Sequence, residues 1–211
     1  MQLWLCCALL VFVAGGCLAQ KPRPCRSPPL YEGSLSMVGE NGNSQVLGKY
    51  SYDALLQRIR VGMFERDGNY TRVTDTLLLY REQVMYEIDY EHKTCQKQEL
   101  MGEFQPLEIP PNFTFLAQMV LGSLSAPGEG VLVNSWAGET TKNQGINVVT
   151  YTEFGCLPVA FLFNAPTSDL VVYTFFNIIL GIKDPSVFIP PPFCDNATLV
   201  AGKGDFFSVF F

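Results

Sequence analysis

The amino-acid sequence predicts an all-β protein of antiparallel strands, arranged as a sandwich or as strongly curved sheets. Three observations carry this prediction. Apolar and polar residues alternate with a period of two in several segments, turn-forming residues separate those segments, and no segment sustains a 3.6-residue period. No internal repeat and no linker divides the chain, so we expect a single domain over residues 20–211.

The residues that precede this domain are typical of a secretory signal. They contain no Lys, Arg, Asp or Glu, hold an apolar run from Leu3 to Ala14, and end with small residues at Cys17 and Ala19. This pattern predicts a signal peptide over residues 1–19. A membrane anchor and a bacterial lipoprotein signal are the alternatives, but the apolar run is shorter than the roughly 20 residues of a spanning helix. We therefore expect a secreted, extracellular protein, and storage in the lysosomal lumen stays open.

The first half of the domain shows the clearest alternation. Ile59, Val61 and Met63 alternate with polar or small residues, and Val84 to Tyr90 repeat the pattern with acidic residues between them. The stretch TLLLYREQVMYEID predicts two strands joined by a polar turn at 81–83. A helix within 96–116 stays possible. Strands are predicted in this half at 34–38, 46–52, 58–64 and 84–91.

The second half carries an excess of large apolar residues. The segment VVYTFFNIIL does not alternate cleanly, so both of its faces would meet apolar surroundings. Two interpretations stay open, a thick core between two layers and a cavity that accepts an apolar ligand. Strands are predicted here at 115–121, 131–136, 146–154, 157–163 and 170–180. The candidate pocket residues are Phe161, Phe163, Tyr173, Phe175, Ile178 and Phe188.

Cysteines and glycosylation sequons agree with secretion. Cleavage after the signal leaves Cys25, Cys95, Cys156 and Cys194, which predict two disulfides in one of three pairings. Their wide spacing disfavours a zinc site. Three Asn-X-Thr sequons lie beside turn signals, where a glycan would stay in solvent. The candidate N-glycosylation sites are Asn69, Asn112 and Asn196.

The charged and reactive residues point away from catalysis and from nucleic acids. The net charge is −6, so no basic surface is available to neutralise phosphates. The single histidine, His92, stands beside Lys93 at a strand end, and no nucleophile or phosphate-loop motif is present. Glu87, Asp89 and Glu91 share one strand face. They allow calcium, although a solvated face is the commoner explanation and the sequence assigns no metal ligands.

Several motifs, in order and at consistent spacing, resemble the ependymin family over essentially the whole mature chain. The most specific is GIKDPSVFIPPPFC at residues 181–194. The others are PCRSPPLYEG, YSYD, VMYEID before TCQK, LEIPPN and GCLPV. The apolar C-terminus, GDFFSVFF, is most similar to the fish ependymins and lacks the additional cysteine of some relatives.

The resemblance implies a fold of two antiparallel curved sheets, half open, like bacterial lipoprotein carriers, with a deep hydrophobic pocket. It also implies Cys25–Cys156 and Cys95–Cys194 bridges, homodimers and calcium association, and no catalytic residues or organic cofactor. We therefore predict a secreted, non-enzymatic glycoprotein that binds a hydrophobic or lipid-like ligand. The alternative is a calcium-dependent adhesion protein of the extracellular matrix, binding collagen or cells with a role in neural plasticity, whose pocket is only core.

Within this interpretation, residues 181–194 form a structural clasp at the sheet edge. Asp184 and Pro185 start a turn, and Phe188 and Ile189 return apolar surface to the core. Pro190 to Pro192 hold the chain in a polyproline-like path that ends at Cys194. Prolines cannot complete a β-ladder, so the segment would also protect that edge from stray pairing.

Overall fold

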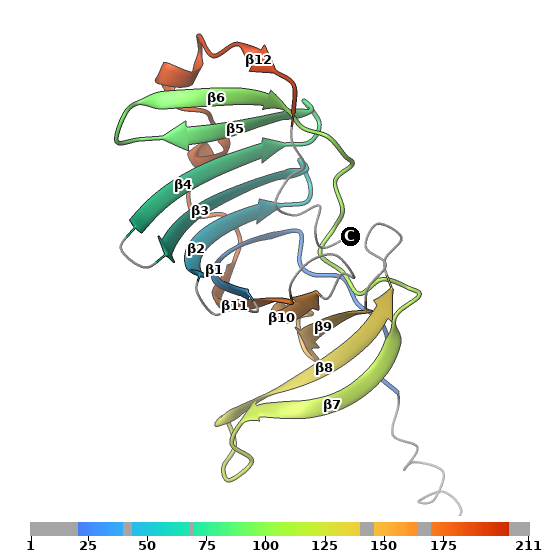
Figure 1. The fold of residues 1–211 in the computed structure, drawn as a ribbon. Coiled ribbons are helices and arrows are strands. Elements are labelled where there is room, and N and C mark those ends of the chain that lie inside the picture. Colours follow the sequence, from blue (N-terminus) through green and yellow to red (C-terminus); the bar gives the residue numbers. More distant parts are fainter. Residues whose placement is uncertain (1–20, 40–43, 68–69, 140–145, 164–169, 203–211) are drawn as a thin grey trace, which may run out of the picture.

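The chain is all β, as the alternation predicts. The computed structural model describes residues 21–39, 44–67, 70–139, 146–163 and 170–202 (Figure 1). The predicted signal peptide and C-terminal tail lie outside these ranges. The first six strands are β1 (Leu30–Gly39), β2 (Ser44–Asp53), β3 (Arg58–Asp67), β4 (Tyr70–Leu79), β5 (Val84–Asp89) and β6 (Thr94–Glu99). The rest are β7 (Thr114–Gly122), β8 (Gly130–Glu139), β9 (Ile146–Thr152), β10 (Pro158–Phe163), β11 (Val171–Leu180) and β12 (Leu199–Val200), with 3₁₀ helices η1 (Pro185–Phe188) and η2 (Pro192–Cys194) before β12.

These strands form one continuous curved sheet. Its order among the described residues is β12-β6-β5-β4-β3-β2-β1-β11-β10-β9-β8-β7. All neighbours are antiparallel except β12, which runs parallel to β6. The resemblance implied two sheets. The two arms, β1 to β6 and β7 to β11, are instead joined by pairing between β1 and β11, and Figure 1 shows the sheet bending at this junction.

The first six strands pair in chain order as a meander, and tight turns form its described β2–β3, β4–β5 and β5–β6 connections. The β2–β3, β4–β5 and β5–β6 turns each end on a residue in the left-handed backbone region, Gln57, Gln83 and Lys93. The β4–β5 turn confirms the polar turn predicted at 81–83. Strand β6, TCQKQE, was not predicted, because its residues are mostly polar. No helix forms in the 96–116 stretch. After β6 the chain continues without regular helix until β7 begins.

A bulge in β11 explains its irregular alternation. Ile179 lies opposite Glu32, but Phe176 rather than Asn177 lies opposite Ser34, so β11 holds one extra residue there. Asn177 has a left-handed φ of 54°. Tyr173 and Phe175 are buried before the bulge, whereas Phe176 and Asn177 are exposed, so the inward-facing register changes within the strand.

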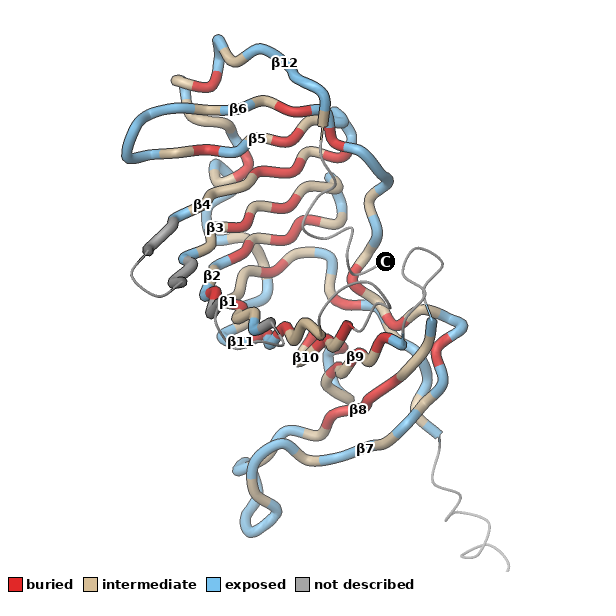
Figure 2. The backbone as a smooth tube through the Cα atoms, in the orientation of Figure 1, coloured by how far each residue is buried: buried red, intermediate tan, exposed pale blue. Residues whose placement is uncertain are grey.

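Buried hydrophobic residues form two separate clusters. Figure 2 marks the buried residues along the strands of both arms. Because neighbouring residues of one strand join different clusters, the two clusters lie on opposite faces of the sheet. The larger one, here called the inner cluster, draws side chains from both arms and includes Tyr31, Leu35, Tyr50, Ile59 and Phe161. The smaller one, the outer cluster, is centred on Leu77, Ile88, Phe188 and Cys194. Neighbouring residues Leu77 and Leu78 belong to different clusters, as the period-two geometry of a strand requires.

Candidate functional site

The inner cluster brings together five of the six predicted pocket residues. Phe161 pairs with Tyr173 across β10 and β11, and its ring lies 4.8 Å from that of Phe175. Phe163 lies against Tyr173 with ring centroids 5.9 Å apart, and Ile178 packs at the margin. This arrangement makes an aromatic centre at the junction of the two arms. The structure therefore brings these five residues together. That they line a pocket stays a prediction.

Four tyrosines extend this aromatic centre, and sequence reasoning did not single them out as site residues. The rings of Tyr31 and Tyr52 lie 4.9 Å apart, and Tyr50 contacts Tyr31 at 5.8 Å and Phe175 at 5.7 Å. Tyr151 contacts Phe161 from the other arm at 5.4 Å. The signal was present in the sequence, since Tyr50 and Tyr52 stand two residues apart on a predicted strand and so share one face.

The tyrosine hydroxyls differ in their hydrogen bonding. The oxygen of Tyr52 accepts a hydrogen bond of 3.0 Å from the backbone N–H of Leu107. The hydroxyls of Tyr50 and Tyr151 have no hydrogen-bond partner among the described residues, and their side chains are buried. Burial raises the pKa of Tyr151 well above its usual range and that of Tyr52 to about 12. These tyrosines are therefore neutral donors at physiological pH.

The segment between β6 and β7 covers part of the inner face. Phe104 packs against Tyr52 and Tyr80, with ring centroids 5.9 Å and 5.2 Å apart. Leu107 and Ile109 are buried in the same cluster. Backbone hydrogen bonds tie the segment to the N-terminal lead-in, from the N–H of Ser27 to the carbonyl of Leu107 and from the N–H of Ile109 to the carbonyl of Cys25, both 2.9 Å long.

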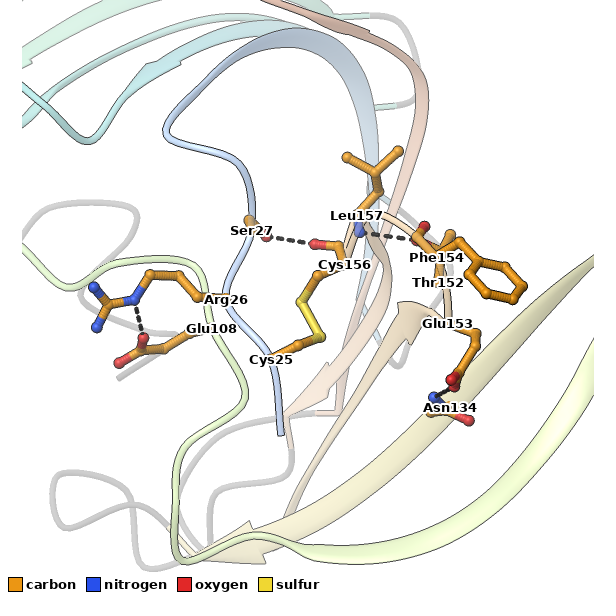
Figure 3. Close-up of a disulfide and its surroundings, with 10 residues drawn as sticks. All are labelled: Cys25, Arg26, Ser27, Glu108, Asn134, Thr152, Glu153, Phe154, Cys156 and Leu157. Atoms are coloured by element: carbon orange, nitrogen blue, oxygen red, sulfur yellow. Dashed lines mark hydrogen bonds and ion pairs between the residues drawn. A yellow bond between two sulfur atoms is a disulfide. The ribbon is translucent and has the colours of Figure 1, made fainter. Parts of the chain in front are cut away.

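A disulfide fixes the lead-in against this cluster. Cys25 is bonded to Cys156, whose carbonyl accepts a hydrogen bond of 2.9 Å from the hydroxyl of Ser27 (Figure 3). Arg26 and Glu108 form an ion pair beside it. Figure 3 shows that the lead-in and the β6–β7 segment run side by side here. The pairing agrees with the one that the resemblance implied, as does the second bridge, Cys95–Cys194.

Phe188, the sixth predicted pocket residue, lies elsewhere. It is buried in the outer cluster, on the face opposite Phe161, and the guanidinium of Arg58 lies 4.4 Å from its ring centroid. The clasp, residues 181–194, crosses this outer face behind β3 to β6 (Figure 1), so it covers a face of the sheet as well as reaching toward its edge. The pocket candidates therefore divide between two faces.

Polar contacts anchor the clasp. Arg60 binds Asp75 through two hydrogen bonds and donates a third, 2.6 Å long, to the carbonyl of Val187 in η1. The Asp75 carboxylate raises the pKa of Arg60. Asp184 caps η1 by accepting from the N–H of Ser186 at 2.9 Å. Between the 3₁₀ helices, Pro191 has φ −64° and ψ 153°, which is the predicted polyproline geometry, whereas Pro192 begins η2 and departs from the predicted path.

The remaining predicted residues lie apart from both clusters. His92 is exposed in the β5–β6 turn and contacts Asp89 at 2.8 Å. Across the part of the chain that the structure describes, no group of three His, Cys, Asp or Glu side chains could hold a metal ion, so Glu87, Asp89 and Glu91 do not form a ready calcium site. Of the sequons, Asn112 and Asn196 are exposed, whereas Asn69 lies outside the described residues.

Comparisons with known proteins agree on one family. A family model described as Ependymin matches residues 68–194. Ependymin-2 of Carassius auratus is 31% identical over 190 residues, which cover 89% of this chain and 88% of that protein. Mammalian ependymin-related protein 1 of Mus musculus is 36% identical over 179 residues, which cover 83% of this chain and 78% of that protein.

Solved structures align with the chain at low sequence identity. An uncharacterized conserved protein from Thermus thermophilus aligns with a TM-score of 0.50 and 10% identity, covering 82% of this chain and 90% of that one. A LolA superfamily protein from Nitrosomonas europaea aligns with a TM-score of 0.36 and 9% identity, covering 78% and 92%. Within the described ranges, no helix has the length and apolar character that a membrane crossing requires.

Proposed function

The chain belongs to the ependymin family, and from that premise we propose that it is a secreted, non-enzymatic protein that binds a hydrophobic ligand against the inner face of its sheet. The observation that carries the proposal is the aromatic inner cluster. It joins rings from both arms of an open sheet, and the β6–β7 connection, with Phe104, Leu107 and Ile109, packs over it from outside the strands. Apolar, aromatic surfaces with few polar groups are typical of ligand sites.

The arrangement also suggests how a ligand would enter. Phe104 and Leu107 cover the tyrosine end of the cluster, and they belong to a connection without regular secondary structure. This connection is held by a few backbone hydrogen bonds and by the Arg26–Glu108 pair. Segments with few such ties open at lower free-energy cost than sheet strands do. Movement of this connection would expose the aromatic rings while the sheet stays paired.

The test is native mass spectrometry on glycoprotein secreted from eukaryotic cells, before and after solvent extraction. We expect discrete adducts that disappear on extraction and return when lipid is added. The variant Phe161→Ala on the inner face should lose the adducts. The control variant Phe193→Ala on the outer face should keep them. An unliganded mass that added lipid does not change would contradict the proposal. It would favour the adhesion alternative, in which the inner cluster is only core.

Secretion and glycosylation are part of the same proposal. The two exposed sequons adjoin the two edge strands of the sheet, Asn112 just before β7 and Asn196 just before β12. Glycans there would stay in solvent, and the one at Asn196 would hinder stray pairing at the β12 edge. Mass loss on enzymatic deglycosylation, with Asn112→Gln and Asn196→Gln each removing one glycan, is the expected result. An unchanged mass would contradict it.

The β7–β8 hairpin supports association of two copies of the chain. Strand β7 is an edge of the sheet, and Leu116 and Leu121 on it are exposed. The hairpin tip exposes Leu124, at 85%. Edge strands with exposed apolar residues pair readily, and antiparallel pairing of β7 with a second β7 would be self-complementary. Leu121→Asp should convert a dimer to a monomer in sedimentation equilibrium, whereas Leu55→Asp in the β2–β3 turn should not. A wild-type monomer would contradict this proposal.

Calcium association and matrix adhesion stay as the alternative proposal. Because the described residues offer no cluster for a metal ion, any calcium would be held weakly, with water completing its shell. Isothermal titration with calcium, together with collagen binding with and without chelator, tests this alternative. Chelator-sensitive collagen binding by protein that takes up no lipid would favour it over the ligand-binding proposal.

A further inference from the structure

The inner cluster contains polar atoms that the described chain leaves without partners. The hydroxyls of Tyr50 and Tyr151 and the indole N–H of Trp136 are buried and make no hydrogen bond among the described residues. A buried polar group without a partner costs about 1–3 kcal/mol. Several such groups on one apolar face indicate that a molecule other than the described chain supplies their partner.

The two tyrosines stand on opposite arms of the sheet and are linked through phenylalanines. Tyr50 on β2 contacts Phe175, Phe175 contacts Phe161, and Phe161 contacts Tyr151 on β9, with ring-centroid distances of 5.7, 4.8 and 5.4 Å. A ligand at this position would therefore meet an aromatic surface together with two hydroxyl donors. The Tyr50 ring lies directly over the backbone of Gly33, at a position where any larger side chain would collide with it. This close contact holds the ring in place.

The charge of the surroundings restricts the polar group that these donors can receive. Among the described residues, the buried polar and charged side chains include no lysine or arginine. Arg26, near the margin, is paired with Glu108, and its side chain is 68% exposed. An ionised group buried here would lose its hydration without gaining a counter-ion, which costs several kcal/mol. A neutral acceptor avoids that penalty and still satisfies the hydroxyls.

We infer that the inner face selects hydrophobic ligands that end in an uncharged hydrogen-bond acceptor, such as the hydroxyl of a long-chain alcohol or the carbonyl of an ester, and that Tyr50 and Tyr151 donate to it. This inference rests on the proposed function and makes it specific. It separates neutral lipids from ionised fatty acids of the same length. It also assigns a specificity role to two residues whose hydroxyls the described part of the fold does not otherwise use.

The experiment uses delipidated, secreted full-length glycoprotein and the fluorescent hydrocarbon diphenylhexatriene as a probe. Three competitors of equal chain length displace the probe, namely oleyl alcohol, oleate at neutral pH, and 1-octadecene, all delivered from cyclodextrin. We expect oleyl alcohol to compete at a concentration about fivefold to tenfold lower than either of the others, the difference that one net hydrogen bond produces. Probe binding itself reports the proposed function.

Tyrosine-to-phenylalanine variants assign the effect to residues. Tyr50→Phe and Tyr151→Phe should each reduce the preference for the alcohol over octadecene, measured within each variant as the ratio of the two competing concentrations. Tyr86→Phe, on the outer face beside Lys97, is the matched control and should keep the preference. Each variant removes a single oxygen, and thermal unfolding will show that both inner variants are folded, because neither loses a hydrogen bond within the described chain.

The outcomes distinguish failure of ligand binding from failure of the neutral-end selectivity. If the probe does not bind, the proposed function fails. If the probe binds but the alcohol and octadecene compete equally, the inference is wrong and the inner face is a purely apolar site. Stronger competition by oleate would also overturn it, since a charged end would then be favoured. Retention of the alcohol preference in both inner variants would remove Tyr50 and Tyr151 from the site.

Discussion

The two faces of the sheet carry apolar clusters that differ in how their polar groups are satisfied. On the outer face, the clasp closes over Leu77 and Ile88, and Arg60 pairs with Asp75 and with a clasp carbonyl. On the inner face, Tyr50 and Tyr151 bury hydroxyls that no described residue bonds. A long-range disulfide is part of each cluster, so covalent anchoring does not distinguish them.

This difference teaches that burial alone does not distinguish the outer cluster from the proposed binding surface. Phe188 and Phe161 are equally well buried, at 3% and 1% exposure, and both were predicted to line one pocket. Only the satisfaction of nearby polar groups sets them apart. A closed core pairs its polar atoms, whereas a surface prepared for a ligand leaves some for the ligand to pair.

The largest expected effect is loss of the outer disulfide. The double variant Cys95→Ser, Cys194→Ser opens a connection of 99 residues in sequence, which the chain-entropy model values at about 4–5 kcal/mol of unfolding free energy. Urea unfolding measures the loss. Binding of diphenylhexatriene should persist below the unfolding transition, because this bridge belongs to the outer face.

The matched comparison is Cys25→Ser, Cys156→Ser, which opens the inner bridge. It should cost a similar free energy and also weaken probe binding, because Cys25 and Cys156 pack in the inner cluster. Equal probe binding by the two folded double variants would contradict the division of roles between the faces.

Next in size is removal of the clasp's aromatic side chain. Phe188→Ala deletes a buried ring together with its contact to the Arg58 guanidinium, which should cost about 3–4 kcal/mol in urea unfolding. Its neighbour Ile189 was also predicted to return to the core, but it is 63% exposed because only Phe188 of this pair turns inward. Ile189→Ala should therefore cost less than about 0.5 kcal/mol. Weaker ligand binding in folded Phe188→Ala protein would return Phe188 to the ligand site.

Much of the fold was predictable from local pattern, and the failures have physical causes. The alternation of Ile59, Val61 and Met63 placed β3 correctly because only one of its faces is buried under a thick apolar layer. Alternation cannot say which face of the whole sheet a strand buries. Ile88 was correctly predicted to be buried, but it belongs to the outer cluster, whereas Met85 on the same strand belongs to the inner one.

Two features of the candidate site could not be predicted from the sequence, because they depend on the three-dimensional arrangement of the strands. Phe188 follows β11 by only eight residues, so its sequence position suggested the same pocket as Phe175, but the chain turns at Gly181 and passes to the other face. The unpaired state of the Tyr50 hydroxyl depends on neighbours from β1 and β11, which no local pattern reports. The disulfide pairing followed from the family resemblance, since spacing alone left three pairings open.

A third prediction concerns alkaline pH and tests the burial of the inner tyrosines. Burial raises the pKa of Tyr52 and of Tyr173 to about 12 each, above the value of about 10 for unfolded tyrosine. The folded state therefore favours the protonated phenol. The stabilisation that this shift represents, roughly 2–3 kcal/mol for each group, is complete below pH ~10 and is lost as the pH rises toward ~12.

Circular dichroism and tyrosinate absorbance, recorded together, measure this loss. Ionisation of the inner tyrosines should coincide with unfolding and should occur above the ordinary range for phenols. A bound neutral ligand should move both transitions to higher pH, because it binds only the folded state. Titration of all nine tyrosines near pH ~10 in protein that stays folded would contradict the burial of the inner set.

The smallest effect compares the same substitution on the two faces. A β-carbon at Gly33 would lie 2.9 Å from the Tyr50 ring, so Gly33→Ala must displace that ring within a packed cluster and should cost about 1–2 kcal/mol. A β-carbon at Gly62 in β3 would meet nothing within 4 Å, so Gly62→Ala should be neutral or slightly stabilising, because alanine loses less backbone entropy in a strand. Because Gly33→Ala moves the Tyr50 hydroxyl without removing it, it should also reduce the preference for oleyl alcohol over octadecene. A stable Gly33→Ala protein with unchanged preference would mean that the position of Tyr50 does not determine ligand choice.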